Sequence, residues 1–141
     1  TEIYTLSLHD ALPISMNARL CIAIASIFGG LSVAGGAFGA HALKAQLTEK
    51  ALSTFELGTR YQMYHSLALL LVGLLWLQLP NNGWLSYASL AFIIGTVIFS
   101  GSLYGLSLSG VKMLGAVTPI GGVFLILGWA LLATATVSLT N

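Results

Sequence analysis

The chain has 141 residues, of which 57% are hydrophobic and only 6% are charged. A soluble domain carries about 25% charged residues, so this composition excludes an ordinary water-soluble protein. The formal net charge is +1 and no basic cluster is present, so the sequence gives no case for nucleic-acid binding. The single cysteine, Cys21, has no second cysteine for an internal disulfide and no neighbouring ligands for a metal site.

Residues 1–15, TEIYTLSLHDALPIS, differ in character from the chain that follows Met16. They hold two of the four acidic residues and one of the three histidines. The stretch resembles the translation of a sequencing adapter that runs in frame into a gene, and it lacks the basic and long apolar regions of a signal peptide. We therefore treat residues 1–15 as a non-native artefact and expect one membrane domain over residues 16–141.

Long stretches without charge predict membrane-spanning helices. No Asp, Glu, Lys or Arg occurs between Arg19 and Lys44, between Arg60 and Lys112, or after Lys112. A spanning helix needs about 20 mostly apolar residues, so the middle run has room for two. Its PNNG stretch at 80–83 favours a helix stop and a turn. We predict four spans, near 20–42, 61–79, 84–106 and 114–138.

The stretch between the first two spans, LTEKALSTFELGTR (47–60), is rich in charge. Thr48 is typical of a helix N-cap and Glu49 of a first helical turn, so we predict a short amphipathic helix that lies at the membrane interface and runs into span two. One straight helix over 49–79 would be about 46 Å long, which exceeds a hydrocarbon core of about 30 Å. We therefore expect a bend near Gly58.

The start of the fourth span has two interpretations. Thr118 and Pro119 suit a helix beginning there, because the missing N–H of proline costs nothing in a first turn. Alternatively, the helix starts at Met113 and Pro119 kinks it.

Short connections make neighbouring spans antiparallel. We therefore predict an all-α fold, an integral membrane four-helix bundle with a short amphipathic helix between spans one and two. Both termini are then on one side. The distribution of Lys and Arg favours the loops with Lys44, Lys50, Arg60 and Lys112 inside the cell and the termini outside.

Small residues recur at the four-residue spacing that lets membrane helices approach closely. A glycine costs about 1 kcal/mol of helix propensity relative to alanine, so frequent glycine suggests compensation by packing. The alternative is that the glycines line a pore or a ligand groove. The predicted packing positions are Gly35, Gly39, Gly101, Gly105, Gly121 and Gly122.

Ionisable residues in or near a span are candidates for function because they are expensive there. One side of the predicted bundle gathers such a polar cluster, comprising His41, Glu56, Arg60, Tyr61, Gln62 and His65. Glu56 and Arg60 have the spacing of a helical ion pair. The two histidines suit a proton relay, because imidazole titrates near neutral pH, or they hydrogen-bond carbonyls at helix ends. Their spacing matches no metal signature.

Four motifs occur in order along the chain: GAFGAH, YQMYHSLALL, FSGSLYGLSL and TPIGGVFLILGWALL. Together they resemble the domain-of-unknown-function 423 family of small inner-membrane proteins, over about residues 17–138. The resemblance implies four spans and a bacterial plasma-membrane location, and it carries no assigned reaction. It points to Gly36, Phe38, Gly39, Ala40 and His41, then Tyr61, Gln62 and His65, then Ser100, Gly101, Ser102 and Tyr104, and finally Thr118, Pro119, Gly121, Gly122 and Trp129.

Three functions follow as hypotheses. The first is a non-enzymatic bundle that associates with itself or with a larger membrane complex, in contact with membrane lipids. The second is a small transporter or proton-coupled channel that uses His41 and His65. The third is a lipid-binding protein at the interface, with Arg60 near the headgroups. The sequence contains no recognisable catalytic arrangement or cofactor motif, so we predict neither an enzyme nor a cofactor.

Overall fold

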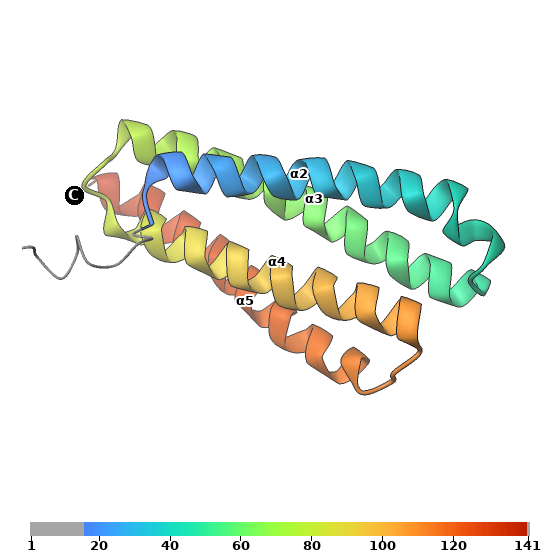
Figure 1. The fold of residues 1–141 in the computed structure, drawn as a ribbon. Helices are drawn as coiled ribbons and strands as arrows, with labels where there is room; N and C mark the ends of the chain where they lie inside the picture. The colour runs from blue at the N-terminus through green and yellow to red at the C-terminus, as the bar shows by residue number, and fades with distance from the viewer. Residues whose placement is uncertain (1–15, 141) are drawn as a thin grey trace, which may run out of the picture.

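The structure is a computed structural model that describes residues 16–140, so the expected artefact at residues 1–15 lies outside the described part. Figure 1 shows four long helices joined by short connections. They are α2 (Ala18–His41), α3 (Glu49–Gln78), α4 (Gly83–Ser109) and α5 (Leu114–Val137), with the short 3-10 helices η1 (Leu43–Ala45) and η2 (Ser138–Thr140). Residues 16–140 contain no strand, which confirms the all-α prediction.

Polar side chains begin three of the four long helices. The side-chain oxygen of Asn17 accepts a hydrogen bond from the Leu20 N–H at 2.9 Å, and Thr48 caps α3 as predicted. Asn82, from the turn at 79–82, caps α4. Such caps satisfy N–H groups that a helix start leaves without a partner. The α4 helix ends at Gly110, whose φ of 71° lies in the left-handed region that glycine adopts readily.

The amphipathic helix predicted between spans one and two is the first part of α3, and it runs into span two as expected. At Gly58, where we expected a bend, α3 stays helical without interruption. Only η1 lies between the first two long helices. Tertiary contacts explain the continuity: the ring of Tyr104 covers Gly58, and the Ser100 hydroxyl donates to the Gly58 carbonyl at 2.7 Å. These contacts hold the glycine inside the helix in spite of its weak propensity.

The start of α5 agrees with the second of the two interpretations. The helix begins at Leu114, directly after Met113, and Pro119 lies within its first two turns. The Leu114, Gly115 and Ala116 N–H groups donate to Val111, Lys112 and Met113 carbonyls, so the first turn is tight. Proline this close to a helix start removes few internal hydrogen bonds, which explains why the helix tolerates it.

The four long helices run antiparallel, and each packs mainly against its neighbours in sequence (Figure 1). Helices α2 and α3 form one hairpin, α4 and α5 form the other, and α3 against α4 joins the two hairpins. Residue 16 and the end of α5 lie at the same end of the molecule as the 79–82 turn, which we call the terminal end. The connections 42–48 and 110–113 lie at the opposite, loop end.

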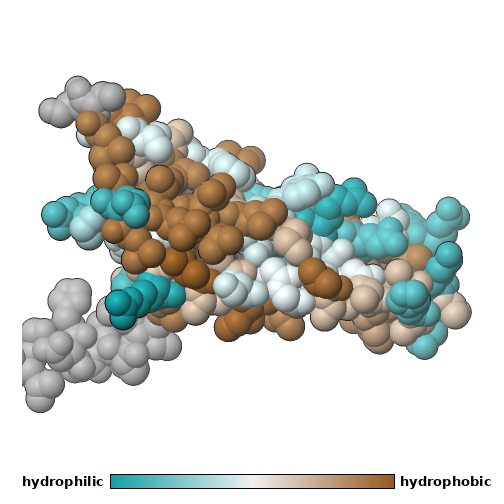
Figure 2. All heavy atoms as spheres, turned by 90° about the horizontal axis from the view of Figure 1, so that it is seen from above, coloured by the Kyte–Doolittle hydropathy of each residue, from teal (hydrophilic) through white to brown (hydrophobic). Residues whose placement is uncertain are grey.

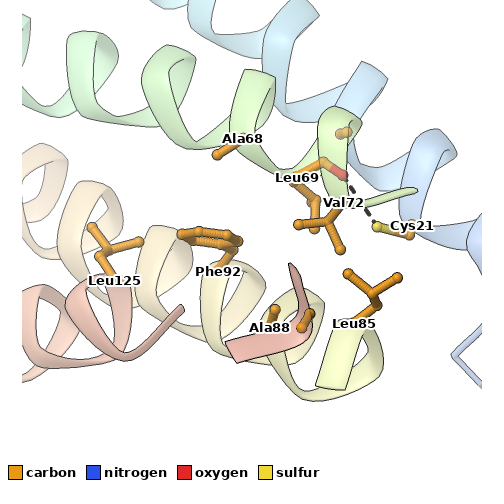
Figure 3. Close-up of a cluster of buried hydrophobic side chains, with 10 residues drawn as sticks. Cys21, Ala68, Leu69, Val72, Leu85, Ala88, Phe92 and Leu125 are labelled. Carbon is orange, nitrogen blue, oxygen red and sulfur yellow. Dashed lines mark hydrogen bonds between the residues drawn. The ribbon is translucent and has the colours of Figure 1, made fainter. Parts of the chain in front are cut away.

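The buried core sits between the hairpins and toward the terminal end. Figure 3 shows Leu69 and Val72 of α3 beside Leu85 and Phe92 of α4, with Cys21 of α2 at one edge. All five side chains are fully buried. Helix α3 packs on α2 within its own hairpin and on α4 of the other hairpin, so it occupies a central position in the bundle.

The outer surface is built for hydrocarbon. Large apolar side chains are exposed on every long helix, as at Ile27 (59%), Leu71 (55%), Val97 (57%) and Ile126 (71%). Three helical segments, Ala18–Ala45, Gly83–Ser109 and Leu114–Val137, are long and apolar enough to cross a membrane. In the view of Figure 2, strongly hydrophobic surface is concentrated toward the terminal end, where a few hydrophilic patches also lie, whereas hydrophilic and pale surface is more frequent toward the loop end.

Glycines bring α4 and α5 into backbone contact. A Cβ added to Gly121 would overlap the backbone of Phe99, and one added to Gly95 would lie 2.9 Å from the Leu125 nitrogen. Close backbone approach of this kind drives association of helices in lipid, where hydrophobic burial does not. The packing role predicted for Gly121 is therefore supported.

The other predicted packing glycines divide into groups. A Cβ on Gly35 would lie 3.1 Å from the Thr59 side chain of α3, and one on Gly39 would lie 3.2 Å from the Phe55 ring. A Cβ on Gly105 would lie 2.8 Å from the end of the Leu114 side chain. Gly122 makes only ordinary contact with Phe99, at 3.8 Å. Gly101 has nothing within 4 Å, so the prediction is wrong there: its face of α4 is not covered. Close-packed glycines that the spacing did not single out are Gly29, Gly58, Gly73, Gly95 and Gly128.

One buried hydroxyl, that of Thr96 in α4, has no hydrogen-bond partner among the described residues. A buried polar group without a partner costs about 1–3 kcal/mol, and valine has nearly the same shape as threonine. We expect Thr96→Val to raise the free energy of unfolding by about 1 kcal/mol, measured in detergent micelles. Ser100→Ala is the contrast, because it removes the bond to Gly58 and should destabilise. Loss of stability in Thr96→Val would contradict the assignment.

Candidate functional site

Side chains of α2 and α3 hydrogen-bond across the helix pair at four levels. As the position rises along α3, the partner position falls along α2, as antiparallel packing requires. The donors and carbonyl acceptors are Ser32 to Thr59 (2.6 Å), Gln62 to Phe28 (2.8 Å), Ser66 to Ala25 (2.7 Å) and Cys21 to Leu69 (3.3 Å, the dashed line in Figure 3). Without water, buried polar side chains need such partners, and together these bonds fix the register of the pair.

Gln62 lies where three helices meet, and its side chain is 6% exposed. Its amide nitrogen donates to the Phe28 carbonyl of α2, and its amide oxygen accepts from the Tyr104 hydroxyl of α4 at 2.6 Å. The Tyr104 ring in turn packs on Phe55, with ring centroids 5.0 Å apart. Both ends of one amide are therefore used, and Gln62 connects α2, α3 and α4.

His65 is buried with both ring nitrogens in hydrogen bonds. Nδ1 lies 2.7 Å from the Tyr61 carbonyl, and the Trp129 indole N–H donates to Nε2 at 3.2 Å. A carbonyl only accepts and an indole N–H only donates, so Nδ1 carries the proton and Nε2 does not. The imidazole is therefore neutral in this arrangement. A second proton would have to displace Trp129.

A groove of about 560 Å³ opens beside His65 on the outer surface between α3 and α5. Its lining is mainly aromatic and aliphatic and includes Tyr61, Tyr64, Phe99, Leu125 and Trp129. Such walls suit apolar molecules from the surrounding lipid. Within residues 16–140, no three His, Cys, Asp or Glu side chains come together as a metal site would require.

The six residues of the predicted cluster do not form one group. Gln62 and His65 are buried and Tyr61 is partly buried, whereas His41, Glu56 and Arg60 are exposed. His41 ends α2 at the loop end. Gly39, two residues before His41, packs against Phe55, and Phe55 lies about 15 Å along α3 from His65 at a rise of 1.5 Å per residue. The expectation that the two histidines are neighbours is wrong, because the continuous α3 carries His65 far from its start.

Glu56 and Arg60 share the outer face of α3 but do not form the predicted ion pair. Within residues 16–140, no oxygen–nitrogen contact of 4.0 Å or less joins them to each other or to another charge. Both side chains are exposed, and the structure records no hydrogen bond for either.

The two charges lie level with the apolar part of α2. Their neighbours Phe55 and Thr59 contact Gly39 and Gly35, and Thr59 also accepts from Ser32. Helix α2 has no Asp, Glu, Lys or Arg after Arg19, and it ends at His41, about 3 Å beyond Gly39 and about 14 Å beyond Ser32. Helix α3 therefore carries charge at a height where α2 has none. Helix α3 is not among the helices that are apolar enough to cross a membrane, because even its charge-free last 18 residues, 61–78, include Gln62, His65 and Gln78.

Sequence reasoning chose Gln62 and His65 but missed their partners, Tyr104 and Trp129. Hydrophobic periodicity contains no signal for these pairs, because the partners lie on other helices. Both partners nevertheless lie in the motifs that carried the family resemblance. The same motifs supply Ser102 and Thr118, whose hydroxyls lie 2.6 Å apart between α4 and α5. The motifs thus mark side chains that connect helices.

Comparison with known proteins agrees with the resemblance. The family model described as "Protein of unknown function (DUF423)" matches residues 35–122. A UPF0382 membrane protein of Staphylococcus epidermidis is 44% identical over 118 residues, which cover 84% of this chain and 95% of the relative. The UPF0382 membrane protein YwdK of Bacillus subtilis is 40% identical over 119 residues, 84% of this chain and 97% of YwdK.

The Escherichia coli UPF0382 inner membrane protein YgdD is 38% identical over 124 residues, 88% of this chain and 94% of YgdD. No solved structure matches the chain. The relatives' membrane location and the three apolar helices agree on a multi-pass protein of the plasma membrane. The family match and these identities together show that the chain belongs to the DUF423 family.

Proposed function

We propose that the protein crosses the membrane four times and acts without catalysis, by binding another membrane-embedded protein through the outer face of α3. Helix α3 lies between α2 and α4 and packs against both. Its hydrogen bonds to α2 extend from Ser32 to Cys21. A helix held along its length between two apolar helices has to cross the bilayer with them, and this supports the fourth crossing.

The unpaired Glu56 and Arg60 are the observation that carries the proposal. On insertion scales, a charged side chain at the centre of a spanning helix costs about 2.5–3.5 kcal/mol, and the cost is smaller at Glu56 and Arg60, which lie in the first half of the 30-residue α3. The side chains lean toward the start of α3, which reduces the cost but leaves both charges level with apolar helices. A protein partner that supplies opposite charge at this height would offset the penalty.

The hydrogen bonds of the interior polar side chains support a structural role for these side chains. The Ser32, Ser66 and Ser100 hydroxyls donate to helix carbonyls, and both nitrogens of His65 are occupied. No hydroxyl or thiol in these bonds is paired with a base in the way that nucleophilic catalysis requires. The separation of His41 from His65 also removes the pair on which a proton relay was based.

Photocrosslinking in native membranes tests the association. A photoreactive amino acid replaces Leu67 on the outer face of α3, and the matched control replaces Val97 on the uncovered face of α4; their side chains are 52% and 57% exposed. We expect a protein adduct from position 67 and only lipid adducts from position 97. Equal protein adducts at both positions, or no protein adduct at position 67, would contradict the proposal.

A further inference from the structure

We infer that the partner is a second copy of this chain, held through α3 by reciprocal contacts between Glu56 of one copy and Arg60 of the other. The inference rests on the proposed association and names its partner. Its starting point is that the exposed face holds one acid and one base. A surface with both signs of charge is complementary to itself, whereas a surface with a single sign needs a different partner.

The exposed side chains of α3 form a regular stripe. Arg60 is followed by Tyr64, Leu67, Leu71 and Leu74, at alternating spacings of four and three residues. The four apolar members are 52%, 52%, 55% and 47% exposed, so neither α2 nor α4 covers the stripe. A mean spacing of 3.5 residues is the seam of two helices that pack at a small left-handed crossing angle.

Membrane insertion fixes how two such stripes meet. Both copies cross the bilayer in the same direction, so their α3 helices run parallel about a two-fold axis along the membrane normal. Leu67 then faces Leu67 of the second copy, and the stripes meet along their length. Close apolar packing of this kind is the main force between helices in lipid.

The same symmetry brings opposite charges together. Glu56 precedes Arg60 by four residues, or about 6 Å along the axis, and an arginine side chain extends toward the start of its helix. Arg60 of each copy therefore reaches the height of Glu56 of the other, and the contact occurs twice. Charges paired in this way are shielded from hydrocarbon by the protein around them.

Charge reversal in the full chain tests the arrangement, with Leu67→Cys as the crosslinking site in native membranes. Cys21 is fully buried and provides no competing thiol at the surface. In the Leu67→Cys background, we expect Glu56→Arg or Arg60→Glu to reduce the crosslinked dimer about tenfold or more, because like charges then face each other. The double variant, Glu56→Arg with Arg60→Glu, should recover most of the dimer. Lys112→Glu, a reversal at the loop end and away from the stripe, should leave it unchanged.

The outcomes separate this inference from the proposed function. A self-adduct that falls in both single variants and returns in the double variant supports the reciprocal pairs. The reciprocal pairs are overturned if a single variant crosslinks as well as the Leu67→Cys parent. They are also overturned if the double variant crosslinks as poorly as the single variants at equal membrane content. Adducts to a different protein alone overturn self-pairing and keep the proposed association. The absence of any protein adduct overturns both.

Discussion

Gly121→Ala is expected to lower the free energy of unfolding by about 3 kcal/mol, the upper end of what overpacking of a tight interface costs. The added methyl group would occupy the space of the Phe99 backbone, which no side-chain rotation can clear. Helices α4 and α5 would have to separate, and the nearby contact of Gly95 with the Leu125 nitrogen would be lost with them. Unfolding of the purified protein in mixed detergent micelles measures the change.

Gly101→Ala is the matched control for this substitution. Gly101 lies on an uncovered face of α4 and has no atom within 4 Å of an added Cβ. Since alanine is the better helix former, we expect a change between zero and a gain of about 1 kcal/mol. Equal loss of stability in the two variants would mean that glycine flexibility, and not close packing of α4 on α5, is what the protein requires.

Gln62→Met is expected to destabilise by about 2 kcal/mol, since it removes the bond to α2 and leaves the half-buried Tyr104 hydroxyl without its acceptor. Methionine has a similar volume and an apolar side chain, so packing changes little. The Phe28 carbonyl keeps its place in the α2 helix, and the larger part of the loss therefore comes from Tyr104. The same detergent-unfolding measurement reports it.

A double-mutant cycle with Tyr104→Phe isolates the contribution of the Gln62–Tyr104 bond. Removing both partners leaves no stranded hydroxyl, so the double variant should be more stable than the sum of the single losses predicts, by about 1 kcal/mol. Strictly additive losses would show that the two side chains do not interact across α3 and α4.

The helical elements were predictable because their signals are local. Runs without charge marked the apolar helices, Thr48 marked the start of α3, and the PNNG turn marked the break between α3 and α4. The continuity of α3 was not predictable from the same signals. A change from polar to apolar character near Gly58 looks like a boundary, and only contacts from Ser100 and Tyr104 of α4 override it.

The site was predictable only in part, for a related reason. Polar residues within an apolar stretch of sequence are conspicuous, and Gln62 and His65 were predicted for this reason. Their partners Tyr104 and Trp129 depend on how helices distant in sequence are rotated against each other. The rotation of α4 about its axis also explains the wrong prediction at Gly101. The spacing of small residues shows that they share one face of a helix, but it does not show whether another helix covers that face.

The hydrogen bonds between α2 and α3 imply unequal tolerance to mutation at their two ends. Each acceptor is a main-chain carbonyl, so the residue that provides it keeps that oxygen whatever its side chain is. Phe28 and Ala25 can therefore drift among residues of similar size without loss of the bond. The donors Gln62 and Ser66 have no such freedom. In a mutational scan, sensitivity to loss of polar character should be concentrated at the donor positions alone.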